Sequence, residues 1–298
     1  MIFHERVWMA LPDFIRDSKA LRRPLLVIGR FLLSQLTFGP ALFRRAAYDA
    51  MPIPYLVTGH PEHFVVATSD KVIGRELFLH GEFDFHKLQL ARTILLREGL
   101  QPPSHLVDVG ANIGTILIPA IKRGLVNSAT AVEPHPANLR LLHANLALND
   151  ILSKVNVLAV AVGDSTGDTL RLKESATNSG NHSIDTEGIP VSSMRLDDLE
   201  IPPNSLLWMD IEGYEGHALM GAMDLLAAGT PVVCEYNPSY LLRSGGLPKF
   251  QKALLGRRIF DLKGGSEKEI TLEELVSNYP DGPDFTDILA IPAGAALK

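Results

Sequence analysis

Two apolar runs of the chain end in a carboxylate and could together hold a cofactor. The first reads HLVDVGANIG over residues 105–114, so Asp108 ends the run and Gly110 and Gly114 follow it. The second, AVEP, places Glu133 at the end of another run. In a parallel sheet such strand ends meet at one edge, where ligands bind. The pattern predicts a site for a nucleoside-bearing cofactor, with Glu133 accepting hydrogen bonds from both ribose hydroxyls.

The spacing of this glycine turn distinguishes between two classes of cofactor. Dinucleotide sites typically carry G-x-G-x-x-G, where backbone amides and a helix N-terminus face a pyrophosphate. Here Asn112 stands in the place of the middle glycine, between Gly110 and Gly114. S-adenosylmethionine contains no pyrophosphate and does not need that glycine. The turn therefore favours S-adenosylmethionine over NAD.

A third apolar run ends in several acids and could be the place of a reaction. In the stretch LLWMDIEGYE, Asp210, Glu212 and Glu215 surround one strand end. Carboxylates this close repel one another unless a cation, a proton or a hydrogen-bonding ligand offsets their charge. We therefore place Asp210 near the methionine end of the cofactor and Glu212 facing an acceptor. Glu215 fits the preference for acids at a helix N-terminus.

The family resemblance described below implies methyl transfer to an alcohol, which would need a base because an alcohol is a poor nucleophile. A positioned base contributes about 10²–10⁴-fold to such a reaction. The candidates are Asp210, Glu212 and Glu235, which ends the next apolar run, and His182 in a polar loop. His217 better fits a structural role at the start of a helix.

We predict a base-assisted route without a metal, and a metal-assisted variant remains open. Asp210, Glu212, Glu235 and Asn237 would offer oxygen ligands of the kind that Mg²⁺ and Ca²⁺ prefer. The sequence has no spacing of His and Cys that would indicate zinc. Methyl transfer that survives exhaustive chelation would exclude the metal-assisted variant.

The composition is that of an ordinary globular protein. Of the 298 residues, 46% are hydrophobic and 21% are charged, which argues against a disordered chain and suffices for a full core. The net charge of −6 gives no basic surface for nucleic acid, so we expect no such partner. The single cysteine, Cys234, cannot form a disulfide within the chain. We therefore expect a reducing compartment, in practice the cytoplasm.

Strand and helix patterns alternate from about residue 86 to the end, which predicts an α/β fold. We expect a Rossmann-like, doubly wound and mostly parallel sheet of seven strands, flanked by helices. The domain would cover residues 51–298, with its core at about 86–298, after a helical extension at 1–50. Helices are expected at 86–97, 116–122, 136–149 and 216–226, and strands at 55–58, 63–68, 106–107, 129–132, 155–162, 206–211, 232–236, 258–262 and 287–291.

The most apolar window, residues 24–43, approaches the length of a membrane span. Arg30 and Gln35 interrupt it, and Gly39-Pro40 breaks it. Charges of both signs precede it, unlike a signal peptide. The pattern favours a helical lid packed on the domain. A helix in peripheral contact with a membrane surface is the first alternative, and a true span is the second.

Several motifs, taken together and in this order, resemble the FkbM-type S-adenosylmethionine-dependent methyltransferases. They are DVGANIG at 108–114, EP at 133–134, AVAVGD at 159–164 with Gly167, RLDDL at 195–199, MDIEGYE at 209–215 and CEY at 234–236. The resemblance covers roughly residues 80–240 and implies the fold and cofactor named above. It assigns cofactor binding to Asp108, Gly110, Asn112, Gly114 and Glu133, and places Ala161 and Asp164 near the adenine.

The same resemblance implies the kind of acceptor. Members of that family are typically O-methyltransferases that act on hydroxyls of sugars, glycolipids or polyketide-like products. We therefore expect a hydroxylated small molecule or glycan as the acceptor. Trp208-Met209 stands where many relatives carry a more aliphatic or lysine-containing run, so the acceptor side departs from the family pattern. The sequence does not indicate an oligomeric state.

Two other classes of protein remain open. An NAD(P)-dependent oxidoreductase could use a similar sheet, although the missing middle glycine disfavours it. A non-catalytic binding protein could retain the fold, although the intact turn and the acids disfavour that reading. Calorimetry with S-adenosylmethionine against NAD would separate the first class, and an assay of turnover would separate the second.

Overall fold

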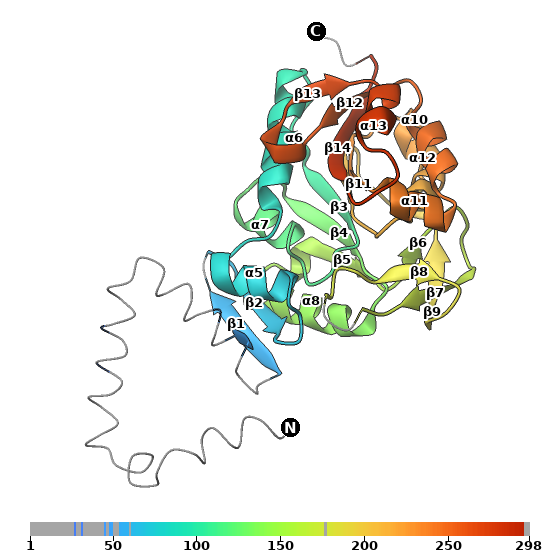
Figure 1. The fold of residues 1–298 in the computed structure, drawn as a ribbon. Helices are drawn as coiled ribbons and strands as arrows, with labels where there is room; N and C mark the ends of the chain where they lie inside the picture. The colour runs from blue at the N-terminus through green and yellow to red at the C-terminus, as the bar shows by residue number, and fades with distance from the viewer. Residues whose placement is uncertain are drawn as a thin grey trace.

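The computed structural model of the chain describes residues 54–59, 61–175 and 178–294 and five single positions before them. Within these residues the central sheet has eight strands in the order β13-β12-β14-β11-β10-β3-β4-β5 (Figure 1). Their bounds are β3 His105–Val109, β4 Ser128–Val132, β5 Val155–Leu158, β10 Ser205–Met209, β11 Val232–Tyr236, β12 Arg257–Asp261, β13 Lys268–Ile270 and β14 Thr286–Pro292. The prediction of seven strands was one too few, because the three residues of β13 are too short to show an alternating pattern.

The sheet is mostly parallel, as predicted, and its strand order reverses beside β3. β4 pairs with one edge of β3 and β10 with the other, both in parallel. β5 and β11 extend the parallel part, while β14 is antiparallel to both β11 and β12. The strand order therefore reverses between β3 and β10, and a ligand crevice is expected at their carboxyl ends.

Helices cover both faces of the sheet (Figure 1), which confirms the doubly wound, Rossmann-like arrangement. Alternate residues of β10 enter different cores: Leu206 and Trp208 join one cluster, and Leu207 and Met209 join the other. The first core is covered by α5 Ile73–His80, α6 Phe85–Arg97, α7 Leu117–Lys122 and α8 Pro136–Leu148. The second is covered by α9 Glu215–Met220, α10 Met223–Ala227, α11 Pro238–Ser244, α12 Leu247–Leu254 and α13 Leu272–Asn278.

A second, smaller sheet follows β5 and differs from the prediction. It has the order β6-β9-β7-β8 and consists of β6 Ala161–Val162, β7 Thr169–Lys173, β8 Ser183–Asp185 and β9 Ile189–Met194. The single strand predicted at 155–162 ends at Leu158, and β6 pairs with β9 instead of continuing in the central sheet. The apolar run is continuous through this break, so the sequence pattern could not reveal it.

The helix predicted at 216–226 is two helices, α9 and α10, separated at Gly221. A Cβ on Gly221 would lie 2.1 Å from the carbonyl oxygen of Gly163, so the chain passes too close to the second sheet for any other residue. The other predicted helices are confirmed as α6, α7 and α8. Pro136 is the first residue of α8, a position where proline loses no hydrogen bond.

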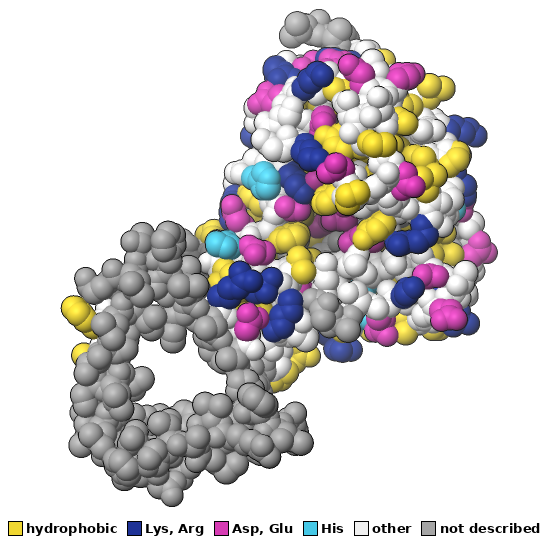
Figure 2. Space-filling model, viewed as in Figure 1, with side chains coloured by type: hydrophobic (Ala, Val, Ile, Leu, Met, Phe, Trp, Pro, Cys, Tyr) yellow, Lys and Arg dark blue, Asp and Glu magenta, His cyan; other side chains and the backbone are white. Residues whose placement is uncertain are grey.

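The short strands predicted before the domain core are confirmed as an antiparallel hairpin, β1 Tyr55–Gly59 and β2 His63–Ala67. Side chains of α8 hold it, since Oδ1 of Asn145 accepts from the Val65 N–H at 2.6 Å. The predictions for residues 1–50, including the apolar window 24–43, lie outside the described residues apart from single positions. In the described part of the chain, no helix is long and apolar enough to cross a membrane. Figure 2 shows basic and acidic side chains intermixed over the face in view.

Candidate active site

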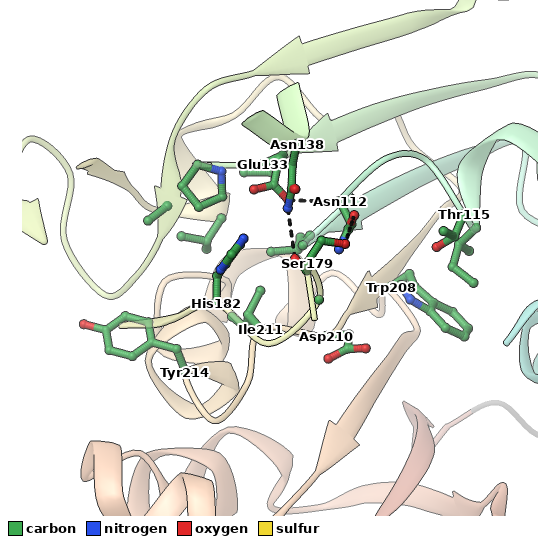
Figure 3. A pocket seen from close by; sticks show the side chains of 18 of the residues that line it. Asn112, Thr115, Glu133, Asn138, Ser179, His182, Trp208, Asp210, Ile211 and Tyr214 are labelled. Carbon is green, nitrogen blue, oxygen red and sulfur yellow. Dashed lines mark hydrogen bonds between the residues drawn. The ribbon is translucent and has the colours of Figure 1, made fainter. Parts of the chain in front are cut away.

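A pocket lies at the carboxyl ends of β3, β4 and β10. Its empty space, including the part that is open to solvent, is about 850 Å³. This is the position expected from the reversal of strand order. Five of the predicted site residues line it: Gly110, Asn112, Glu133, Ala161 and Asp210. Figure 3 shows Glu133 and Asp210 on different walls, with Ser179 and His182 between them.

Glu133 is buried in the pocket wall and fixed by two backbone hydrogen bonds. The N–H of Asn112 donates to its Oε2 at 2.8 Å, and the N–H of His135 donates to its Oε1 at 2.7 Å. Burial raises the pKa of Glu133 to about 7, and these two hydrogen bonds oppose the rise. The Asn138 side chain adds a third hydrogen bond, and a carboxylate with about four lone-pair sites then retains one for a ligand. The carboxylate is therefore oriented before a ligand enters.

The glycine turn has the left-handed backbone that its sequence predicts. Gly110, Asn112 and Gly114 have φ angles of 85°, 49° and 93°. A Cβ on Gly110 would lie 2.0 Å from the Asp210 carbonyl oxygen, and a Cβ on Gly114 would lie 2.6 Å from Ile118. The glycines therefore allow the turn to pack closely against the rest of the protein.

Asp108 is buried behind the pocket and does not line it. Its carboxylate accepts from the backbone of Leu117 at the start of α7, while its Oδ2 has no partner in the described chain. Burial raises the pKa of Asp108 to about 7, and the nearby charges of Asp210 and Glu133 add to the rise. Asp108 therefore has a structural position behind the glycine turn, where it is hydrogen-bonded to the start of α7.

The two residues assigned near the adenine lie differently. Ala161 lines the pocket, whereas Asp164 does not. The Nζ of Lys249 lies 2.5 Å from Asp164, and this contact lowers the pKa of that carboxyl. His217, which also contacts Lys249, stacks on Tyr214 with ring centroids 4.2 Å apart. Tyr214 is the pocket residue on this side, so Asp164 lies behind it.

A polar loop before β8 covers one side of the pocket. The Asn138 side chain donates to the Ser179 carbonyl at 3.1 Å, and the Ser179 hydroxyl bonds to Asp70 and Asn112. The Nδ1 of His182 accepts from a backbone N–H at 2.9 Å. Burial lowers the pKa of His182 to about 4, so the neutral ring carries its proton on Nε2. His182 can therefore donate a hydrogen bond into the pocket, which does not fit the role of a base.

The acids after β10 and β11 form a cluster beside the pocket. One carboxylate oxygen from each of Asp210, Glu215 and Glu235 lies within 4.8 Å of the other two. Asp210 is open to the pocket space, but the surrounding protein desolvates it and raises its pKa to about 7. Burial likewise raises the pKa of Glu215 to about 7 and that of Glu235 to about 11, with neighbouring carboxylates adding to the latter. Neither Glu215 nor Glu235 lines the pocket.

Glu212 lies near this cluster, whose charges at Asp210 and Glu215 help to raise its pKa, but it does not belong to the group of oxygens within 4.8 Å. Its φ of 55° is in the left-handed region, which non-glycine residues seldom adopt. The amide nitrogen of Asn181, oriented toward it, donates to the two carboxylate oxygens at 3.2 and 3.0 Å. Burial raises the pKa of Glu212 to about 9. We predicted that Glu212 faces an acceptor in the pocket, but Glu212 is not among the residues that line it.

A lysine that the sequence analysis missed lies on the far side of the cluster. The Nζ of Lys87, near the start of α6, lies 2.7 Å from Asp84 and 2.6 Å from Asp287. Asp84 lines the pocket, and Asp287 pairs in register with Glu235 on the neighbouring strand. The carboxylates raise the pKa of Lys87 against the effect of burial. Asp84 is only three residues from Lys87, but Asp287 lies far from it along the chain, so the sequence near Lys87 does not indicate this second partner.

Comparison with protein families matches residues 108–288 to the methyltransferase FkbM domain, which is more than half of the chain. The chain belongs to this family. Two cobalt-precorrin-6B C(15)-methyltransferases (decarboxylating), from Salmonella typhimurium and Salmonella typhi, are each 41% identical over 71 residues. That stretch is 24% of this FkbM chain and 37% of those proteins, so the chain matches well under half of their length.

Solved structures of methyltransferases resemble this FkbM chain at low identity. A methyltransferase FkbM from Methylobacillus flagellatus is 15% identical with a TM-score of 0.39, and the match covers 85% of this chain and 59% of that one. TYW2 from M. jannaschii, solved in complex with AdoMet, is 13% identical with a TM-score of 0.42, covering 81% and 86%.

S-adenosylmethionine is the cofactor of this FkbM domain, and the pocket fits it. Glu133 offers an oriented carboxylate with a lone pair left for a ribose hydroxyl. Val160 and Ala161 give the adjoining wall an apolar surface that suits a base ring. Asp210 provides a carboxylate on the other wall. The donor set therefore matches a ligand with a nucleoside at one end and a charged group at the other.

Proposed function

We propose that this FkbM domain transfers the methyl group of S-adenosylmethionine to a hydroxyl group of a sugar, a glycolipid or a related metabolite. The observation that carries the proposal is that Glu133 and Asp210 line one pocket from different walls (Figure 3). Glu133 would hold the ribose at one end. Asp210 is then left at the other end, beside the place where methyl transfer would occur.

Bound S-adenosylmethionine supplies a methyl group on a positively charged sulfur. Transfer is an in-line displacement in which the C–O bond forms as the S–C bond breaks. Alignment of the two partners by the pocket walls can supply roughly 7–11 kcal/mol. The proton of the acceptor hydroxyl passes to the carboxylate of Asp210, whose pKa of about 7 suits a base at neutral pH. Glu212 and Glu235 have a smaller part, because neither lines the pocket.

The acidic surroundings support a hydroxyl as the acceptor. A hydroxyl must lose its proton as the new bond forms, and a carboxylate next to the pocket can take that proton. His182, neutral and with its proton on Nε2, can donate a hydrogen bond to a second oxygen of the acceptor. Sugars and glycolipids carry several hydroxyls and would offer such a pair.

Two measurements test this proposal. Calorimetry should show binding of S-adenosylmethionine and no binding of NAD, and a methyl-transfer screen over glycans, glycolipid precursors and small hydroxylated metabolites should identify an acceptor. Asp210→Asn should then lower turnover about 10²–10⁴-fold, which is more than it lowers cofactor affinity. The matched control is Asp224→Asn, on the exposed side of α10. Preference for NAD, or cofactor binding without transfer to any acceptor, would contradict the proposal.

A further inference from the structure

The cluster of Asp210, Glu215 and Glu235 brings three carboxyl groups together without an ion-pair partner in the described chain. Its three carboxylate oxygens lie within 4.8 Å of one another and come from the ends of β10 and β11 and the first residue of α9. Among the described residues, none of the three acids forms an ion pair with a basic side chain. The neighbouring acids Asp84 and Asp287 differ, because Lys87 lies between them.

Two of these acids have a buried oxygen without a hydrogen-bond partner. Glu215 is fully buried, and its Oε1 accepts from the N–H groups of Ile211 at 2.9 Å and Gly213 at 3.3 Å. Its Oε2 has no partner in the described chain, and the same is true of Oε2 of Glu235. An unsatisfied buried carboxylate oxygen is costly in free energy. Two of them in one cluster indicate that a ligand binds there.

We propose that Asp210, Glu215 and Glu235 bind a divalent cation that prefers oxygen ligands, Mg²⁺ or Ca²⁺, beside the methyl-transfer pocket. Opposite ligands are about 4.0–4.2 Å apart around Mg²⁺ and about 4.6–5.2 Å apart around Ca²⁺. Oxygens up to 4.8 Å apart can therefore share Ca²⁺ as they stand, whereas any pair separated by more than about 4.2 Å would have to move closer to share Mg²⁺. The cluster has no histidine or cysteine ligand, which disfavours zinc.

This ligand set differs from the one that the sequence left open. Glu212 faces Asn181, and the Asn237 side chain accepts from the Tyr240 N–H at 3.3 Å to cap α11. Glu215, which the sequence analysis assigned to a helix N-terminus, takes their place because its side chain points back toward the end of β10. Only the fold brings Glu215 and Glu235 together.

The role of the cation in methyl transfer rests on the proposed function, whereas its binding does not. Because Asp210 lines the pocket, a cation that it binds would be next to the acceptor hydroxyl. A divalent cation lowers the pKa of an oxygen that it contacts and fixes its position. The O–H bond of the acceptor breaks as the C–O bond forms, and the proton ends on a carboxylate oxygen that does not contact the cation.

The test is a titration of the full chain after exhaustive treatment with EDTA. MgCl₂ and CaCl₂ are titrated separately by calorimetry, without cofactor or acceptor. We expect one cation to bind per chain with at least one of the two salts, and the same salt to raise the midpoint of thermal unfolding. Glu215→Gln and Glu235→Gln should each weaken binding at least about tenfold and remove the thermal shift. Glu273→Gln, an exposed glutamate in the first turn of α13, is the matched control and should bind like the wild type.

The result that would overturn the inference is a metal-free chain that binds neither cation, or variants that bind as tightly as the wild type. Calorimetry with S-adenosylmethionine on the same sample keeps the two proposals apart. Cofactor binding without cation binding overturns the cation site alone, because protons would then offset the acids. If Glu215→Gln does not unfold cooperatively, Glu235→Gln decides the outcome, since its side chain is partly exposed.

Discussion

Gly110 packs so closely against the backbone of Asp210 that a Cβ on Gly110 would lie 2.0 Å from the Asp210 carbonyl oxygen. The N–H of Asp210 donates to the carbonyl of Val109, one residue before Gly110, at 3.1 Å. The glycine turn and Asp210, which both line the pocket, are therefore in direct contact. Any displacement of the turn also moves Asp210.

Gly110→Ala should disturb both sides of the pocket at once. Left-handed backbone alone costs a non-glycine residue about 1–2 kcal/mol, and the overlap with Asp210 adds to that cost. The matched control is Gly124→Ala, because Gly124 has a φ of 71° and open space where a Cβ would lie. Urea denaturation should show a larger loss of unfolding free energy for Gly110→Ala, and calorimetry should show that it alone weakens cofactor binding. Equal losses in the two variants would mean that the contact with Asp210 is unimportant.

Glu133→Gln should weaken binding of S-adenosylmethionine about 10–100-fold, the loss expected for charge-assisted hydrogen bonds of about 1.5–3 kcal/mol. The carboxylate accepts from Asn112 and His135, and a glutamine amide would turn a donor toward one of these N–H groups. The measurement is calorimetry with the cofactor. Glu174→Gln is the control, because Glu174 is exposed and contacts His135 from outside the cofactor pocket. An unchanged affinity would remove Glu133 from the cofactor site.

Much of the cofactor side could be predicted from the sequence, because it depends on local pattern. An apolar run, a carboxylate and a glycine turn lie consecutively in the chain, and the order of strands in a parallel sheet then places Glu133 near Gly110. The acceptor side depends on contacts between distant residues. Lys87 and Asp287 are 200 residues apart in the sequence, and Glu215 and Glu235 belong to different elements. No local pattern indicates these pairs.

The small sheet was missed for a different reason. Residues 155–162 form one β-branched run that the sequence pattern cannot divide, yet hydrogen bonding divides it after Leu158. Gly163 donates to the Met194 carbonyl, and the strands that follow carry polar residues on their exposed side. Alternation over so few residues is a weak signal. The polar loop around His182 was predicted from its composition, but the strands on either side of it were not.

Asp108→Asn should make the folded chain more stable at pH 8 than the wild type. Burial raises the pKa of Asp108 from 3.8 to about 7, so the folded chain binds this proton more tightly than the unfolded chain does. The stability that this gives is complete below pH 3.8 and is lost as the pH rises through 7. Asparagine stays neutral and avoids that loss, so at pH 8 the free energy of unfolding of the variant should exceed that of the wild type by roughly 1–4 kcal/mol.

The measurement for Asp108 is the free energy of unfolding between pH 6.5 and 8. This window avoids the titration of His182. Because burial lowers the pKa of His182 from 6.5 to about 4, its contribution to folding stability is lost only as the pH falls below 6.5. The difference between Asp108→Asn and the wild type should increase with pH across the window. A constant difference would show that Asp108 is already ionised in the folded chain.

Lys87→Met should destabilise the chain by roughly 3–5 kcal/mol, because removal of one partner leaves buried charge uncompensated. Asp287 lies 2.6 Å from the Lys87 amine and close to Asp210 and Glu235, and among the described residues Lys87 is its ion-pair partner. Asp287→Asn in the Lys87→Met background should recover most of the loss, as measured by chemical denaturation. Lys71→Met is the control, because its ion pair with Asp49 is exposed and should contribute less than about 1 kcal/mol. A loss no larger than that of Lys71→Met would show that Lys87 does not offset the acids beside the pocket.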